Sequence, residues 1–150
     1  MELFDIISND IKEAMKAKDK VALDTLRNIK KVLLEAKTAP GANDTVSDET
    51  AIKLIQKLAK QGKESAELYS SQNRPELAQE ELAQVAVMEK YLPKQLSEDE
   101  IKTVLAGIIE QTGASGPQDM GKVMGVATKQ LAGKAEGKTI SAIVKQLLNN

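Results

Sequence analysis

Apolar residues recur at steps of three and four along most of this chain, which is the spacing of helices that bury one face. The pattern predicts helices over about residues 2–18, 48–72 and 75–91, and further helices that include residues 23–36, 98–112, 120–131 and 140–148. No stretch alternates between apolar and polar residues as a half-buried strand does. The sequence therefore predicts an all-α fold of about seven helices.

Helix boundaries coincide with capping residues and chain breakers. Ser47 is a good N-cap for the third helix, and Ser97 with Glu100 three residues later forms a capping box for the fifth. Breaks rich in glycine, proline and turn formers lie at residues 39–44, 113–117 and 133–138. Gly62 stands inside the third helix, where it costs about 1 kcal/mol relative to alanine. The close approach of a second helix is the expected reason for that glycine.

The segment Leu92–Leu96, which contains Pro93, is the best boundary between two parts of the chain. It separates four longer helices from a compact group of three. We therefore expect an N-terminal helical domain over residues 1–96 and a C-terminal three-helix domain over residues 97–150.

The amino-acid composition excludes several kinds of chemistry. The 150 residues include no Cys and no His, which excludes disulfides, thiol nucleophiles, metals ligated by either residue and His-containing catalytic triads. The net charge of −1 argues against non-specific coating of nucleic acid. No apolar run approaches the roughly 18 residues of a membrane span, and the acidic start of the chain is unlike a targeting segment. A cytoplasmic protein without membrane association is therefore expected.

The sequence predicts no catalytic residue, no metal ligand and no cofactor. Adjacent carboxylates cluster where helices begin, where they stabilise helix ends, and no serine lies in a known catalytic motif. Gly133–Thr139 imitates a phosphate-binding Walker A loop, but only three residues separate its two glycines and a helical segment precedes it. We interpret it as a helix–helix turn, in which glycine adopts a positive φ and Thr139 caps the next helix.

The small net charge conceals two segments of opposite sign. Residues 97–119 carry one basic and five acidic side chains, a charge of −4, whereas residues 120–150 carry five lysines and one glutamate, a charge of +4. In the second segment a glycine-containing turn flanked by lysines leads into a helix N-terminus, which suits a backbone phosphate of RNA. An ordinary solvated helix face is the alternative. The candidate RNA-binding residues are Lys122, Lys129, Gly133, Lys134, Gly137 and Lys138.

Several passages, taken together, resemble the GatB/YqeY family. They are Ala14–Asp19 with Leu23–Arg27, Lys63–Glu67 with Arg74–Leu77, Tyr91–Leu96, and Asp119–Gly125 followed by Leu131–Gly137. The last passage also resembles the tail of the B subunit of glutamine-dependent tRNA amidotransferases. The resemblance implies an all-helical fold with an N-terminal helical part and a C-terminal three-helix part, the latter corresponding to the tail that contacts tRNA in that enzyme. Catalysis in that enzyme belongs to other domains, and no motif of this chain supplies an amidase centre or an ATP site.

Three functions are consistent with these observations. The first is a tRNA-binding module, free-standing or accessory to an amidotransferase, and the second is a helical protein-interaction module with no nucleic-acid ligand. The third is participation in amide transfer, because the resemblance implies an association with carbon–nitrogen ligases that use glutamine as amide donor. Without a catalytic motif, we expect no turnover from the chain alone. The expected partners are tRNA, amidotransferase subunits or another protein.

Overall fold

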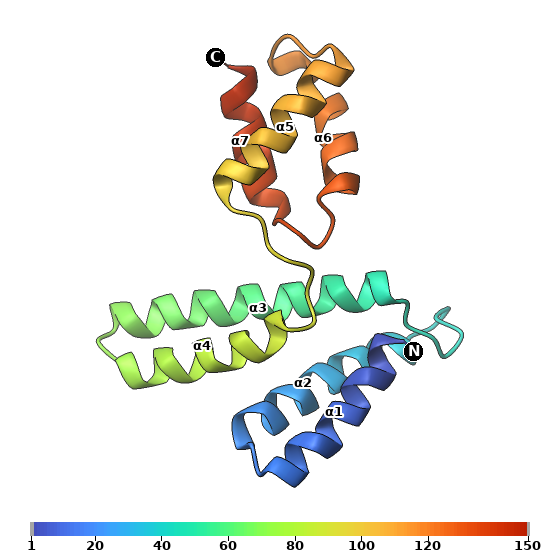
Figure 1. Cartoon of the computed structure of the whole chain (residues 1–150), viewed down its shortest axis with the longest axis vertical. Coiled ribbons are helices and arrows are strands. Elements are labelled where there is room, and N and C mark those ends of the chain that lie inside the picture. The colour runs from blue at the N-terminus through green and yellow to red at the C-terminus, as the bar shows by residue number, and fades with distance from the viewer. Residues whose placement is uncertain (1, 150) are drawn as a thin grey trace. The chain divides into compact units, whose positions relative to one another are not determined.

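The computed structural model describes residues 2–149, which form seven α-helices and one short 3-10 helix and contain no strand. The prediction of an all-α fold is confirmed. The chain divides into two compact units, residues 1–92 and 93–150 (Figure 1). Pro93–Leu96 thus belong with the C-terminal helices. No helix among residues 2–149 is long and apolar enough to span a lipid bilayer.

The N-terminal unit contains two helical hairpins, of which α1 (Leu3–Ala17) and α2 (Lys20–Lys37) form the first (Figure 1). Lys18 ends α1 in the left-handed conformation, with a φ of 55°. The side chain of Asp19 then accepts a hydrogen bond from the backbone N–H of Ala22 at 3.1 Å. Two residues are enough to reverse the chain here, because capping groups satisfy the backbone at both helix ends.

The second hairpin joins α3 (Asp48–Ser71) to α4 (Pro75–Glu89), and α4 also packs against α2. Gly62 lies in the interface between α3 and α4: a Cβ atom at this position would stand 2.6 Å from Cγ2 of Val85. The expectation that this glycine permits close helix packing is confirmed. An ion pair between Lys63 and Glu89, with an N–O distance of 3.1 Å, also joins the two helices.

The core of the N-terminal unit contains side chains from all four helices. Each helix contributes apolar residues at the spacing that the sequence pattern predicts, and the largest completely buried ones are Ile7, Ile29, Leu33 and Ile55. Burial of one such side chain stabilises the fold by about 1.5–3 kcal/mol. Hydrophobic packing therefore holds the two hairpins together.

The C-terminal unit is a bundle of α5 (Glu98–Thr112), α6 (Met120–Gln130) and α7 (Gly137–Leu148), with the 3-10 turn η1 (Pro117–Asp119) ahead of α6. Each of the three α-helices contacts the other two. The buried apolar side chains of this unit are Ile101, Leu105, Ile108, Val123, Ala127, Leu131, Ile140, Ile143, Val144 and Leu148. This unit thus has a hydrophobic core of its own.

The predicted N-caps of α3 and α5 are present. Ser47 accepts a hydrogen bond from the backbone N–H of Thr50 at 3.2 Å. Ser97 accepts one from the N–H of Glu100 at 3.2 Å, while the Glu100 carboxylate accepts one from the N–H of Ser97 at 3.4 Å. This reciprocal pair is the expected capping box, and it holds the pKa of Glu100 below its ordinary value, because the Ser97 N–H and hydroxyl favour the carboxylate.

The fourth helix is shorter than the sequence pattern predicts. The pattern extends to about Tyr91, but α4 ends at Glu89, and backbone hydrogen bonds of the tighter three-residue type follow just before Pro93. Tyr91 turns toward α1, where its hydroxyl donates a hydrogen bond to the Asp10 carboxylate at 2.6 Å. Partial burial, and then this hydrogen bond, raise the pKa of Tyr91 above its ordinary value.

Candidate nucleic-acid interface

The predicted site extends over α6, the turn that follows it and the start of α7, and the turn itself contains Gly133 and Lys134. α6 ends with a hydrogen bond from the N–H of Leu131 to the carbonyl of Ala127 at 2.9 Å. Gly133 then has a φ of 76°, which confirms the predicted positive φ; a side chain would be strained there. The prediction that Thr139 caps the next helix is wrong. α7 begins at Gly137, so Thr139 lies within its first turn.

The four lysines of the predicted site are all exposed. Lys122 and Lys129 lie seven residues apart on α6, which places them on one helix face about 10 Å apart along the axis. Lys134 lies in the turn, and Lys138 is the second residue of α7. The lysines therefore come from three consecutive parts of the C-terminal unit.

The two glycines of the predicted site have different surroundings. Gly137 is exposed, and a Cβ atom added to it would meet no other side chain within 4 Å. Gly133 is buried within the turn. Gly137 can therefore lie directly against a ligand, whereas Gly133 supports the shape of the turn.

The inner side of this turn is hydrogen-bonded to the segment that precedes α5. The side-chain amide of Gln95 donates to the carbonyls of Gly133 at 2.6 Å and Pro93 at 3.0 Å. The backbone N–H of Leu96 donates to the carbonyl of Lys134 at 3.0 Å. Sequence reasoning missed the role of Gln95, because its partner lies 38 residues away and no local pattern connects the two.

Two further glycines leave part of α6 uncovered. Gly121 and Gly125 form a small-xxx-small pattern, which outside a membrane indicates close helix packing at most. A Cβ atom at either position would have open space around it, so neither is needed for packing within the described chain. Because Lys122, Gly125 and Lys129 follow at steps of three and four, the exposed backbone around Gly125 lies between two lysines.

The electrostatics of this surface favour an anion. The first hydrogen bond of α7 runs from the N–H of Ile140 to the carbonyl of Glu136 at 3.0 Å, so the amides of residues 137–139 lie ahead of the helical hydrogen bonds. Such amides, together with the helix dipole, attract negative charge. Among residues 2–149 there is no group of three or more acidic side chains placed to hold a metal ion. Exposed lysines and amides at a helix start are groups that can bind an anion such as phosphate.

Comparison with known proteins identifies the family. The family model described as Yqey-like protein matches residues 4–148, and the chain belongs to this family. Two similar proteins are both named Altered inheritance of mitochondria protein 41, mitochondrial. The protein from Pyrenophora tritici-repentis is 31% identical over 129 residues, which cover 84% of this chain and 69% of the relative. The protein from Meyerozyma guilliermondii is 34% identical over 87 residues, which cover 57% of this chain and 44% of the relative.

The names of these relatives contradict the predicted cytoplasmic location, since both are named as mitochondrial proteins. The prediction is wrong because it relies on the absence of cysteine and of long apolar segments. These features describe how a chain folds and which redox chemistry it can perform. They do not distinguish one compartment from another.

Proposed function

We propose that the C-terminal unit binds the phosphate backbone of tRNA. The observation that carries the proposal is the set of four exposed lysines on α6, in the following turn and at the start of α7. Each lysine can neutralise one phosphate, and the uncovered glycines allow the backbone of an RNA strand to come close to the protein. The resemblance of this segment to the amidotransferase tail is the reason for naming tRNA.

The character of the contact follows from the residues available. Only three aromatic side chains occur in the chain, and all three lie in the N-terminal unit. Without aromatic side chains on which bases could stack, the C-terminal unit would recognise phosphate, sugar and helix shape rather than base sequence. We therefore propose broad binding of structured RNA, with strong dependence on salt.

The test is a double charge reversal, Lys129→Glu with Lys138→Glu, in the full chain. Binding of total tRNA is measured by fluorescence anisotropy at several salt concentrations. Loss of two phosphate contacts is expected to reduce the slope of log affinity against log salt by about 2 and to weaken binding at low salt. The matched control is Lys31→Glu with Lys57→Glu, two exposed lysines of the N-terminal unit, which changes net charge by the same amount.

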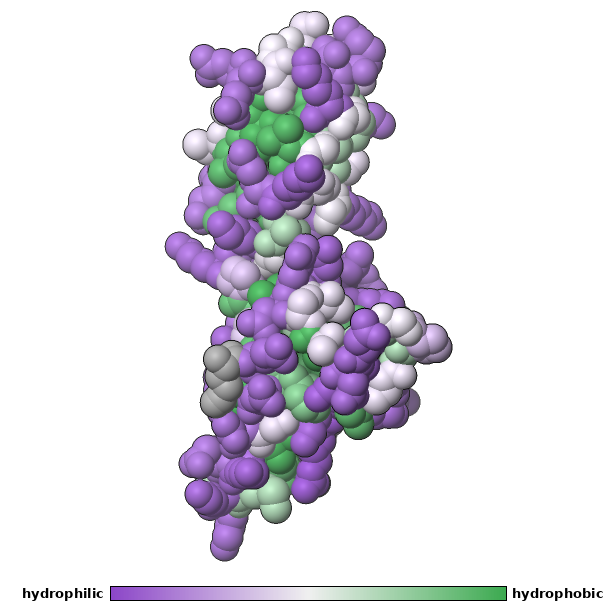
Figure 2. Space-filling model, turned by 90° about the vertical axis from the view of Figure 1, so that its right-hand side faces the viewer, coloured by the Kyte–Doolittle hydropathy of each residue, from purple (hydrophilic) through white to green (hydrophobic). Residues whose placement is uncertain are grey.

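The control separates a local surface from general electrostatic attraction. If both double variants weaken tRNA binding equally, the contact is not located on α6 and α7. If the wild-type chain does not retain tRNA at low salt, the proposal fails. In that case the alternative function, binding of a partner protein, remains. Figure 2 shows an apolar area on the C-terminal unit, bordered by hydrophilic side chains, where such a partner would bind.

A further inference from the structure

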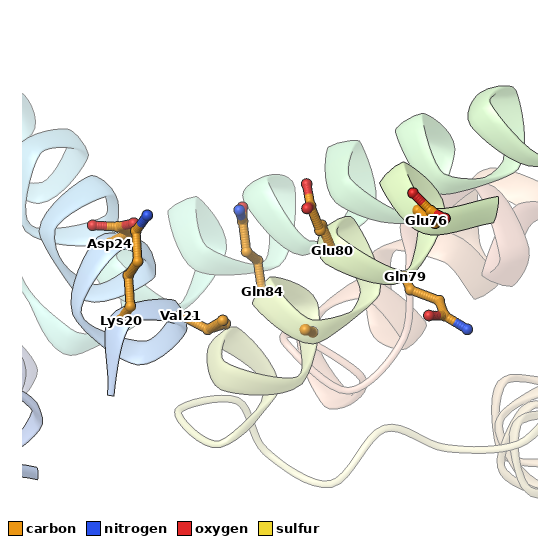
Figure 3. A pocket seen from close by; sticks show the side chains of 8 residues that line it. Lys20, Val21, Asp24, Glu76, Gln79, Glu80 and Gln84 are labelled. Carbon is orange, nitrogen blue, oxygen red and sulfur yellow. The ribbon is translucent and has the colours of Figure 1, made fainter. Parts of the chain in front are cut away.

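A groove of about 560 Å³ lies on the N-terminal unit between the start of α2 and the exposed side of α4 (Figure 3). Lys20, Val21 and Asp24 line it from α2. The residues that line it from α4 are Glu76, Gln79, Glu80, Ala83 and Gln84. All eight belong to a single compact unit, so the groove is a property of the N-terminal fold alone.

The charge of the groove is negative, and most of it comes from α4. Residues 75–89 contain four glutamates and no basic residue. Glu76 and Glu80 are both exposed, and neither forms an ion pair with any described residue of the chain. On the opposite side Lys20 and Asp24 lie together, so their charges offset each other (Figure 3). The uncompensated charge therefore lies along α4.

Apolar side chains accompany these carboxylates. Val21 is 45% exposed and lines the groove together with Ala83. Leu82, which precedes Ala83 on α4, is 49% exposed. On α4 the apolar residues Leu82, Ala83 and Ala86 are exposed, so its contacts with α2 and α3 leave part of its apolar surface uncovered.

We propose that this groove is a docking site for a cationic amphipathic helix of a partner protein. The apolar edge of that helix would cover Val21 and Ala83, while its lysine or arginine side chains would pair with Glu76 and Glu80. Glu76 to Gln84 extend about 12 Å along α4, which matches two to three turns of a docked helix. The charge complementarity favours this occupant over an acidic or purely apolar one.

The site is independent of the proposed RNA contact, because it lies in the other unit and has the opposite charge. The experiment uses the full chain and a fluorescently labelled synthetic peptide of about 15 residues. The leucines of the peptide share one helix face and its remaining positions are mainly lysine. A second peptide has the same composition in an order that places leucines on all faces. Binding is measured by fluorescence anisotropy.

The groove variant is Glu76→Lys with Glu80→Lys, and the matched control is Glu64→Lys with Glu67→Lys on the exposed face of α3. We expect the amphipathic peptide to bind the wild type and the control alike, and the groove variant at least about tenfold more weakly. The reordered peptide should bind the wild type at least about tenfold more weakly than the amphipathic one. Circular dichroism checks that both variants remain folded.

Three outcomes would overturn the proposal. Equal weakening in the groove and control variants would show general attraction to an acidic protein. Equal binding of the two peptides would show that the apolar face plays no part. Self-association of the wild type in sedimentation equilibrium, abolished in the groove variant, would assign the groove to a second copy of this chain instead.

Discussion

Val85 on α4 occupies the space into which a side chain at Gly62 on α3 would extend, with its Cγ2 atom 2.6 Å from the position of a Cβ. Valine is branched at Cβ and has few rotamers in a helix, so it cannot easily move aside. The replacement Gly62→Ala should therefore destabilise the N-terminal unit by about 1–2 kcal/mol, although alanine favours helix by about 1 kcal/mol. Calorimetric unfolding measures the difference.

The chain provides a matched control for this substitution. Gly107 lies inside α5, and a Cβ atom there would have no neighbour within 4 Å. Gly107→Ala should therefore raise the stability of the C-terminal unit by about 1 kcal/mol. Adding Val85→Ala to Gly62→Ala should cost less than the two single changes together, because the smaller side chain makes room. Simple additivity of the two would show that the helices do not press on each other at this point.

The hydrogen bond between Tyr91 and Asp10 predicts a delayed tyrosine ionisation. In a Tyr69→Phe variant Tyr91 is the only tyrosine, and absorbance titration should place its midpoint above the ordinary value of about 10. Because the folded pKa is raised, its contribution to stability is complete below about pH 10 and is lost as the pH rises further. Asp10→Asn should lower the midpoint. An unchanged midpoint would assign the shift to burial alone.

The capping box of α5 predicts a pH effect at the acidic end of the scale. Ser97→Ala should cost about 1 kcal/mol and should return the pKa of Glu100 toward its ordinary value. Because the pKa of Glu100 is lowered in the folded state, the stabilisation from its ionised carboxylate is present above the ordinary pKa of about 4.3 and is lost as the pH falls below it. An NMR titration of the Glu100 side chain, with and without Ser97, measures this directly. If the pKa is the same in both proteins, the box does not form in solution.

Gln95 should prove necessary for the order of the turn between α6 and α7. Gln95→Ala removes the donor to the carbonyls of Gly133 and Pro93 and should cost about 1 kcal/mol. Gln95→Glu should cost more, since it places a carboxylate against two carbonyl oxygens. Hydrogen exchange at the Leu96 amide, which donates to Lys134, should become faster in both variants. Equal exchange in the wild type and both variants would contradict this role.

Local sequence patterns are sufficient to predict the seven helices and the N-caps of α3 and α5. Apolar spacing is a local property, so it assigns residues such as Ile29 and Ile55 to the buried side of their helices without knowledge of their neighbours. Caps also act within four residues: the prediction of Ser97 is confirmed, whereas the predicted cap Thr139 lies inside α7, which begins at Gly137. The family resemblance is also available at this level, and the match over residues 4–148 agrees with it.

Contacts between residues far apart in the chain could not be predicted from local patterns. The groove on the N-terminal unit requires the start of α2 to lie beside α4, and nothing local connects Val21 with Ala83. The Tyr91 hydroxyl donates a hydrogen bond to Asp10, which lies 81 positions away in the sequence. The sequence pattern predicts that Gly133 contacts a ligand, but this residue is buried in a turn and its carbonyl accepts a hydrogen bond from Gln95. Such contacts depend on the packing of whole helices, so the periodicity of one segment cannot specify them.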